Sequence, residues 1–230
     1  MSSLDPTAYD TLSFDCYGTL IDWESGIIGA LGPLLARNRS DLSRSELLAA
    51  FAHNETRIQQ AAARAPYPKV LREVHRAVAG AYGFKTTAEL DAAFGDSVGD
   101  WPAFPDSSDA LARLATKYRL VILSNVDRQS FARTQQKLGV TFDAVYTAEA
   151  IGSYKPDPAN FEYLLRHEAG RLLHVAQSLY HDHAPAKAAG MSTVWIDRNQ
   201  GGAGATPPAP QVSYDLRLAS MAEFAEAAGV

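Results

Sequence analysis

The chain has 230 residues, of which 47% are hydrophobic and 20% charged, and it carries a net charge of -5. This composition is that of an ordinary globular protein, long enough for one large domain or for a main domain with an insertion. The acidic balance provides no basic surface for nucleic acid, so we expect no nucleic-acid partner.

The sequence contains no apolar run long enough to cross a bilayer and no basic N-terminal region followed by an apolar one. We therefore expect a cytoplasmic protein without a membrane partner. The single cysteine, Cys16, excludes an internal disulfide framework. A lone cysteine beside a core strand is more often a small hydrophobic residue than a nucleophile.

The first predicted element is a short buried strand that ends at Asp15 and is followed by a break at Gly18. Ligands of open parallel sheets bind just outside the carboxyl ends of the strands, which is where Asp15 would project. Asp15 could instead cap the next turn, as aspartate often does after a strand. This stretch alone supports both interpretations equally.

The next interval contains helices and no convincing strand. A helix is predicted to begin at Ser43, with Glu46 in the capping-box position. Apolar residues at helical spacing predict three more helices, at residues 23–37, 69–82 and 87–94.

After residue 101 strands alternate with helices. Strands are predicted at residues 119–125, 142–147, 174–178, 193–197 and 214–218, with a Gly- and Pro-rich loop at residues 201–210. Such alternation implies an α/β fold with a Rossmann-like, doubly wound parallel sheet. We expect this core to span residues 1–20 and 97–230, with residues 21–96 inserted as a helical cap over the carboxyl edge of the sheet.

Polar residues follow four of the predicted strands: Asp15, Ser124 with Asn125, Lys155, and Asp182. All these strand ends lie at one edge of a doubly wound sheet. Taken singly, each residue has a structural explanation, as a helix cap or as a solvated lysine. Their occurrence together, in this order, favours a shared site.

These residues lie in segments that resemble the motifs of the haloacid dehalogenase superfamily of hydrolases over nearly the whole chain. The segments are residues 14–20 (FDCYGTL), 123–125 (LSN), 153–158 (SYKPDP) and 176–182 (AQSLYHD). The resemblance implies a Rossmann-like core with a helical cap and Asp15 as a covalent nucleophile. It also implies that Ser124, Lys155 and Asp182 surround Asp15.

Tyr17 distinguishes between branches of this superfamily. Its phosphatases carry a second aspartate two residues after the nucleophile, where this chain has Tyr17. Phosphoryl transfer also uses Mg²⁺ held by carboxylates. Asp182 has no second carboxylate next to it, because residues 177–181 contain neither Asp nor Glu. In this respect the chain resembles the 2-haloacid dehalogenases, which carry a tyrosine at the same place after the nucleophile. This resemblance implies an enzyme without a metal or another cofactor.

The resemblance implies hydrolysis of a small 2-haloacid to the 2-hydroxy acid. Asp15 would attack the carbon that bears the halogen and form an ester, and halide would leave without needing a proton. Lys155 would keep Asp15 ionised, and Asp182 would be the base that positions water on the ester. The remaining expected substrate-binding residues are Tyr17, Thr19, Ser124 for the substrate carboxylate, Asn125 for the halide, and Ser178.

One departure from the pattern concerns the cap. The 2-haloacid dehalogenases resembled here carry a cap arginine that clamps substrate and halide, and alignment on the cap helix puts Ala52 or His53 near that place. Basic residues that could replace it are Arg57, Arg64, Lys69 and Arg72, and the sequence selects none of them. Gln177, Leu179 and Phe161 also differ from the usual motif residues.

Three alternatives stay open at this point. The same attack could open a strained ring or another small carboxylate, the chain could be a phosphatase, or it could bind a small molecule without turnover. The intact set of Asp15, Lys155 and Asp182 argues against the last of these. A homodimer is left open, as are the stereochemistry and the halide preference.

Overall fold

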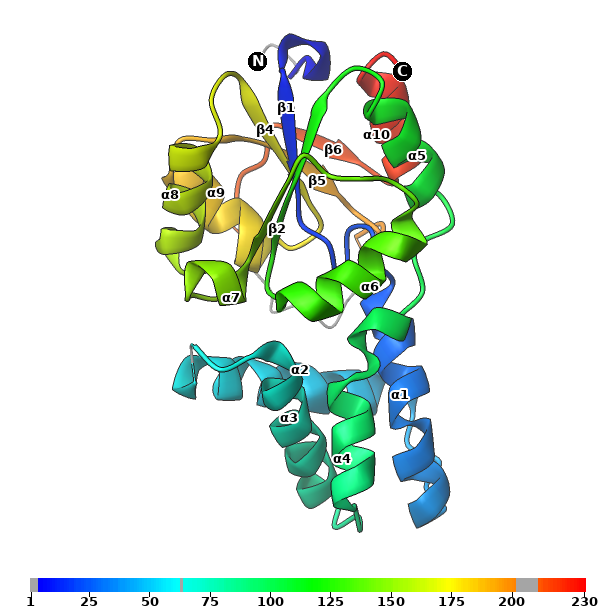
Figure 1. The fold of residues 1–230 in the computed structure, drawn as a ribbon. Coiled ribbons are helices and arrows are strands. Elements are labelled where there is room, and N and C mark those ends of the chain that lie inside the picture. The colour runs from blue at the N-terminus through cyan, green and yellow to red at the C-terminus, as the bar shows by residue number, and fades with distance from the viewer. Residues whose placement is uncertain (1–3, 63, 202–210) are drawn as a thin grey trace.

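The computed structural model describes residues 4–62, 64–201 and 211–230. Its core is a parallel six-stranded sheet in the order β3-β2-β1-β4-β5-β6 (Figure 1). The strands are β1 (Thr11–Phe14), β2 (Arg119–Ser124), β3 (Ala144–Thr147), β4 (Leu172–Ala176), β5 (Ser192–Ile196) and β6 (Leu216–Leu218). The expected α/β fold with a doubly wound sheet is confirmed.

Helices cover both faces of the sheet, which is why the central strands are buried and mostly apolar. On one face Phe14 of β1 packs edge-on against Phe224 of α10, and on the other Phe161 of α8 packs against His174 of β4. The core helices are α5 (Ser107–Leu114), α6 (Arg128–Leu138), α7 (Ala148–Ile151), α8 (Pro158–His167), α9 (Ala184–Ala188) and α10 (Met221–Ala227).

The strand order places the switch point of the sheet between β1 and β4. From β1 the chain proceeds outward to β2 and β3, and it then returns to the other side of β1 for β4, β5 and β6. A crevice forms at such a switch point, outside the carboxyl ends of the two strands. Asp15 follows β1 there and Asp182 follows β4.

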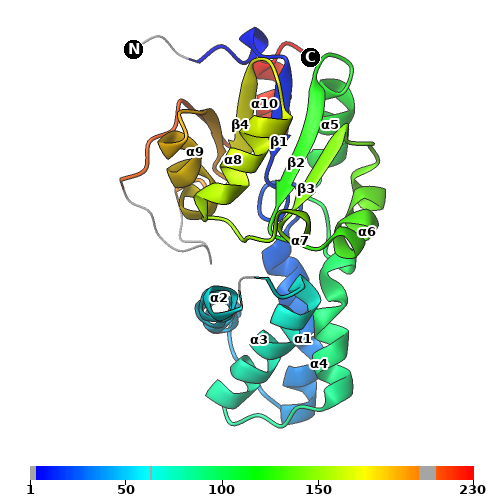
Figure 2. The same cartoon turned by 60° about the vertical axis from the view of Figure 1, so that its left-hand side comes forward.

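Four helices form a cap at this edge of the sheet: α1 (Trp23–Asn38), α2 (Arg44–Ala61), α3 (Tyr67–Ala81) and α4 (Ala88–Gly95) (Figures 1 and 2). The capping box that begins α2 is present, because the Ser43 N–H donates to Glu46 Oε2 over 2.8 Å and the Glu46 N–H donates to Ser43 Oγ over 3.3 Å. The inserted helical cap is thus as expected, and its division from the core at residues 20 and 97 stays a prediction.

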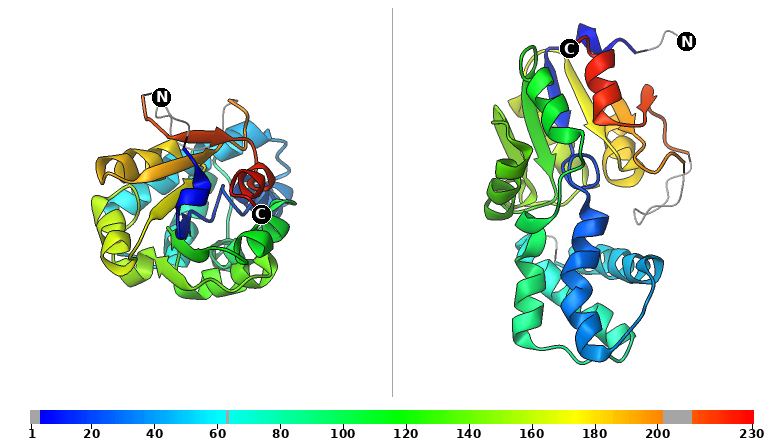
Figure 3. Two further views of the ribbon diagram at one scale, coloured as in Figure 1. Left: turned by 90° about the horizontal axis from the view of Figure 1, so that it is seen from above. Right: turned by 90° about the vertical axis from the view of Figure 1, so that its right-hand side faces the viewer.

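The chain enters and leaves the cap through two segments that lie side by side. The Asp22 N–H donates to Pro102 O over 2.8 Å, and the Phe104 N–H donates to Leu20 O over 3.0 Å. Figure 3 shows α1 and α4 extending from this junction, away from the core. The cap is therefore connected to the sheet directly beside the end of β1.

The structure also differs from the sequence-based expectations. The strand expected at residues 142–147 spans Ala144–Thr147, and the strand expected at residues 174–178 spans Leu172–Ala176. Short elements that were not predicted include α7 and a π-helical turn at Leu179–His183. Most of the Gly- and Pro-rich loop, residues 202–210, lies outside the described residues. Within the part of the chain that the structure describes, no helix is both long and apolar enough to cross a membrane.

Candidate active site

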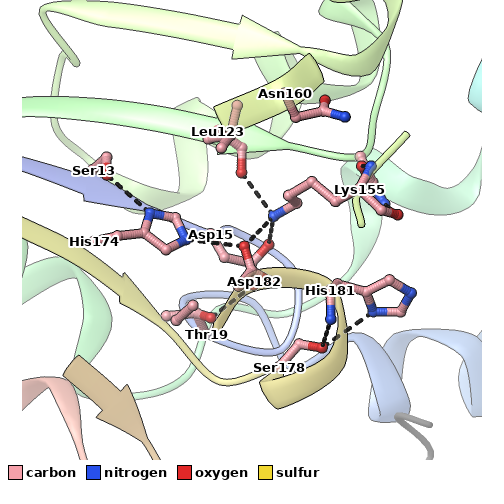
Figure 4. Close-up of polar contacts among 12 residues, drawn as sticks. Ser13, Asp15, Thr19, Leu123, Lys155, Asn160, His174, Ser178, His181 and Asp182 are labelled. Carbon is pink, nitrogen blue, oxygen red and sulfur yellow. Dashed lines mark hydrogen bonds and ion pairs between the residues drawn. The ribbon is translucent and has the colours of Figure 1, made fainter. Parts of the chain in front are cut away.

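Asp15 lies at the centre of a cluster of buried polar groups between β1 and β4 (Figure 4). Its backbone N–H donates to Val175 O over 3.1 Å, so β4 holds the residue at the end of β1. Lys155 Nζ donates to Oδ1 over 2.9 Å, and Thr19 Oγ1 donates to Oδ2 over 2.7 Å. Both carboxylate oxygens therefore have a donor that fixes their orientation.

Lys155 joins the two carboxylates of the site. Its Nζ donates to Asp15 Oδ1, to Asp182 Oδ1 over 2.7 Å, and to the Leu123 carbonyl over 2.9 Å. The side chain is only 2% exposed. Burial disfavours its charge, but the two carboxylates outweigh this effect and raise the pKa of Lys155. Lys155 is thus a permanent cation that pairs both aspartates.

Asp182 has one occupied and one free carboxylate oxygen. Oδ1 accepts from Lys155 and lies 3.0 Å from His174 Nε2, whereas Oδ2 is buried without a hydrogen-bond partner among the described residues. Burial disfavours the charge of Asp182, but Lys155 and His174 outweigh it and lower its pKa. At neutral pH the free Oδ2 can accept a hydrogen bond from a water molecule.

Asp15 has the opposite balance. Burial raises the pKa of Asp15 and the nearby charge of Asp182 adds to this effect, while Lys155 and Thr19 oppose it. A carboxylate of higher basicity is a better nucleophile, and the Lys155 ammonium beside Asp15 favours its ionised form. The site therefore holds one strongly acidic and one less acidic aspartate.

His174 and Ser13 belong to the site and were not expected from the sequence. They are register partners across β1 and β4, and Ser13 Oγ lies 2.9 Å from His174 Nδ1. If Nε2 donates to Asp182, the neutral ring accepts at Nδ1 from the Ser13 hydroxyl, a tautomer we assign from this geometry. The sequence contained one sign of this pair, since Ser13 and His174 are polar residues among the apolar ones of two predicted strands.

Two of the expected substrate-binding residues lie behind the pocket. Thr19 is fully buried, and its Oγ1 accepts from the Gln177 N–H over 2.9 Å while donating to Asp15. Ser124 is also buried, and its hydroxyl has no hydrogen-bond partner among the described residues. Neither is among the described residues that line the pocket, and the roles expected for them stay predictions.

The other three, Tyr17, Asn125 and Ser178, line the pocket. Asn125 Nδ2 donates to Lys155 O over 2.9 Å, and the Lys155 N–H donates to Asn125 Oδ1 over 2.6 Å, so Asn125 braces the loop that carries Lys155. Ser178 Oγ accepts from the His181 N–H over 2.9 Å and begins the π-helical turn that presents Asp182. The halide-binding role expected for Asn125 stays a prediction.

Tyr17 directs its hydroxyl away from Asp15. The oxygen lies 2.8 Å from Thr134 Oγ1 of α6, and the ring packs edge-on against Trp101 with 5.7 Å between centroids. Burial raises the pKa of the Tyr17 phenol well above its usual value. Tyr17 therefore contributes a wall to the pocket, and no acid stands where the phosphatases carry theirs.

The cap forms the opposite wall of a cavity of about 70 Å³. Because one water needs about 10–15 Å³ by this measure, the cavity has room for roughly five waters or a ligand of a few heavy atoms. Its cap and junction residues are Trp23, Ala52, Glu55, Thr56, Gln59, Tyr67 and Trp101.

None of the basic residues considered as replacements for a cap arginine reaches the cavity. Among the described residues, its lining contains Lys155 and His181 but no arginine. Arg57 Nη2 donates to Asn54 over 3.3 Å, Arg72 pairs with Asp96 over 3.1 Å, and both lie outside the lining. The cap instead presents a carboxyl group, that of Glu55.

The carboxylates of the site do not fit a magnesium ion well. Mg²⁺ is held by carboxylate oxygens, and here the Lys155 ammonium already lies between Asp15 and Asp182. Thr19 occupies the second oxygen of Asp15, and Ser178 contributes only a hydroxyl beside them. No group of three or more His, Cys, Asp or Glu residues suited to a metal occurs among the residues described.

Comparison with known proteins identifies the family of this fold. The model of the haloacid dehalogenase-like hydrolase family matches residues 9–190, and the chain belongs to this family. The comparison with curated proteins gave no match.

Solved structures share the fold over nearly their whole length. The chain is 23% identical to the L-2-haloacid dehalogenase PA0810, with a TM-score of 0.78 over 95% of this chain and 97% of that one. It is 19% identical to an L-2-haloacid dehalogenase from Xanthobacter autotrophicus with chloropropionic acid covalently bound, with a TM-score of 0.77 over 95% and 97%. The HAD-hydrolase YfnB from Bacillus subtilis, bound to magnesium, is 18% identical, with a TM-score of 0.77 over 96% and 99%. At these identities the likeness shows the fold alone.

Proposed function

We propose that this hydrolase cleaves the carbon–halogen bond of a small 2-haloacid through an ester of Asp15 and releases the 2-hydroxy acid. The observation that carries the proposal is the arrangement of three buried groups. Lys155 bridges the carboxylate of Asp15 to that of Asp182, whose second oxygen is free to bind water. The covalently bound chloropropionic acid named for the Xanthobacter structure supports the same route here.

In the first step an oxygen of Asp15 attacks the carbon that bears the halogen. A carbon–oxygen bond forms, the carbon–halogen bond breaks, and halide leaves with the bonding electron pair. Halide needs no proton to leave, so the hydroxyl of Tyr17 can remain bonded to Thr134. Lys155 and Thr19 hold Asp15 in one orientation, which reduces the entropy lost on reaching the attack geometry.

In the second step water adds to the Cγ atom of the Asp15 ester, and one of its protons passes to Oδ2 of Asp182. The tetrahedral intermediate then collapses, the bond between Cγ of Asp15 and the ester oxygen breaks, and Asp182 returns the proton to the departing alkoxide of the product. The carboxyl group of Asp15 loses the second proton of the water to solvent. The sum consumes one water and yields hydroxy acid, halide and a proton.

The oxyanion of this second step has a donor already in place. Whichever oxygen of Asp15 attacks, the other keeps its hydrogen bond from Thr19 or from Lys155. A donor that is fixed before the reaction stabilises developing charge without reorganisation. His174 keeps Asp182 oriented from the opposite side.

Halide release from chloroacetate and 2-chloropropionate tests the proposal, with Asp15→Asn as the inactive variant. We expect wild type to release halide equally well with and without EDTA. Asp15→Asn should lose several orders of magnitude in rate, because loss of a covalent nucleophile raises the barrier by about 6–8 kcal/mol. Activity that EDTA abolishes and Mg²⁺ restores, with phosphate release from an aryl phosphate, would support a phosphatase instead.

A further inference from the structure

Glu55 is a carboxyl group of the cap that lines the same cavity as Asp15. The proposed dehalogenation does not use it. It lies on α2, one turn after Ala52, and both residues line the cavity with Asp15. Tyr67 donates its hydroxyl to Glu55 Oε1 over 2.5 Å, and Gln59 Nε2 lies 3.3 Å from the same oxygen. Among the described residues, no donor contacts Oε2.

Among the described residues that line the cavity, no cation is free to pair with Glu55. Lys155 already donates to Asp15, to Asp182 and to the Leu123 carbonyl. His181 is the other basic group of the lining, and burial lowers its pKa to about 4, so the ring is neutral near pH 7. An ionised Glu55 would therefore add a second uncompensated negative charge to a site that holds Asp15, Asp182 and only one lysine.

Near neutral pH, Glu55 is present in both its protonated and its ionised form. Burial raises the pKa of Glu55 to about 7, and the hydrogen bond from Tyr67 partly opposes this effect. The titratable groups that line the same cavity or interact with Glu55 are Asp15 and Tyr17 after β1, Tyr67 on α3, Tyr154 and Lys155 before α8, and His181 and Asp182 on the π-helical turn. Of these, Lys155 is the only cation near pH 7, and it is paired.

We propose that Glu55 determines which substrates the site accepts, favouring a hydrogen-bond donor or cation beside the reacting carbon and disfavouring a free carboxylate. This inference rests on the proposed attack of Asp15 on a small haloalkyl substrate and concerns the group next to the halogen. A 2-haloacid enters as its carboxylate when Glu55 is protonated. A neutral analogue such as a 2-haloamide enters in either protonation state, because its amide N–H can donate to the Glu55 carboxylate.

Ligand binding tests this inference without requiring turnover. Glycolate and glycolamide, the hydrolysis products of chloroacetate and chloroacetamide, differ in one group, a charged carboxylate in the first and a neutral amide with N–H donors in the second. Isothermal titration calorimetry would measure Kd for both at about pH 6 and about pH 8.5. If only the protonated form accepts a carboxylate, the glycolate Kd should rise by at least about tenfold between these values, and the glycolamide Kd should change little.

Three variants give this test its specificity. Glu55→Gln should abolish the pH dependence and keep glycolate binding at the low-pH level. Tyr67→Phe removes a donor to the ionised carboxylate, so the midpoint of the glycolate pH dependence should move upward. Glu73→Gln, in a half-exposed cap residue that pairs with Arg76, is the matched control and should behave as wild type.

Either of two results would overturn the inference: glycolate binding at high pH as tight as glycolamide binding in wild type, or no binding of either ligand at either pH. A failure of the proposed dehalogenation would look different. Halide would then not be released from any substrate, while glycolate and glycolamide would still be distinguished in a pH-dependent manner that Glu55→Gln removes.

Discussion

At the scale of single residues, the site depends on an unequal pair of aspartates that share one lysine. Asp15 is the less acidic, because burial and the charge of Asp182 both favour its protonated form. Asp182 is the more acidic, since Lys155 and His174 outweigh its burial. The inequality separates their roles: the more basic carboxylate attacks, and the other stays ionised with one oxygen open to water.

The raised pKa of Asp15 predicts a loss of activity on the acid side. Attack requires the carboxylate, so the rate should fall as the pH drops through the pKa of Asp15. Because that pKa lies above the ordinary value of 3.8, the acid limb should lie above 3.8 as well. The dependence of kcat/KM on pH for a neutral haloamide measures this limb without a contribution from Glu55. A rate that stays constant down to that ordinary value would contradict the assignment.

Some residues of the site could be predicted from the sequence and others could not, because different features of the fold bring them together. Asp15, Lys155 and Asp182 each follow a strand and stand in ordered motifs, so their meeting at one edge could be predicted. His174 and Ser13 meet because β1 and β4 pair in a particular register. Strand spacing does not define that register, and the pair was therefore missed.

At the scale of elements, α2 carries the part of the cap that determines what the cavity accepts. The helix begins in a capping box and brings Ala52, Glu55 and Gln59 to the cavity. Its start could be predicted from Ser43 and Glu46, and its apolar face from the spacing of Leu47 and Phe51. The short π-helical turn could not, since it arises from the Ser178 side chain bonding to the His181 N–H.

Ser43→Ala should weaken the start of α2. The substitution removes a hydroxyl that accepts from the Glu46 N–H and donates to its carboxylate. The free energy of unfolding should fall by about 1 kcal/mol, the usual contribution of an N-cap. Chemical denaturation measures this difference, with Ser40→Ala outside the helix as a matched control. An unchanged midpoint in Ser43→Ala would show that the capping box contributes nothing.

At the scale of the whole molecule, the site exists only where the cap meets the sheet. The core supplies the nucleophile, the lysine and the second aspartate, and the cap supplies the aromatic and acidic wall. The fold of each part follows from strong local periodicity and could be predicted. Which cap residues face Asp15 depends on how the two parts dock, and for that reason Glu55 was not found from the sequence.

The measurement that tests the central claim most directly is the mass of Asp182→Asn after mixing with chloroacetate slightly below neutral pH. Hydrolysis of the ester loses a general base that contributes roughly 10²–10⁴-fold, whereas the first attack does not need it. The ester should therefore accumulate, and intact-mass analysis should show the added carboxymethyl group, mapped by proteolysis to the peptide that contains Asp15. Halide should appear in a burst of about one equivalent per chain, while wild type measured alongside releases it steadily. Steady turnover by Asp182→Asn without any adduct on Asp15 would contradict the account.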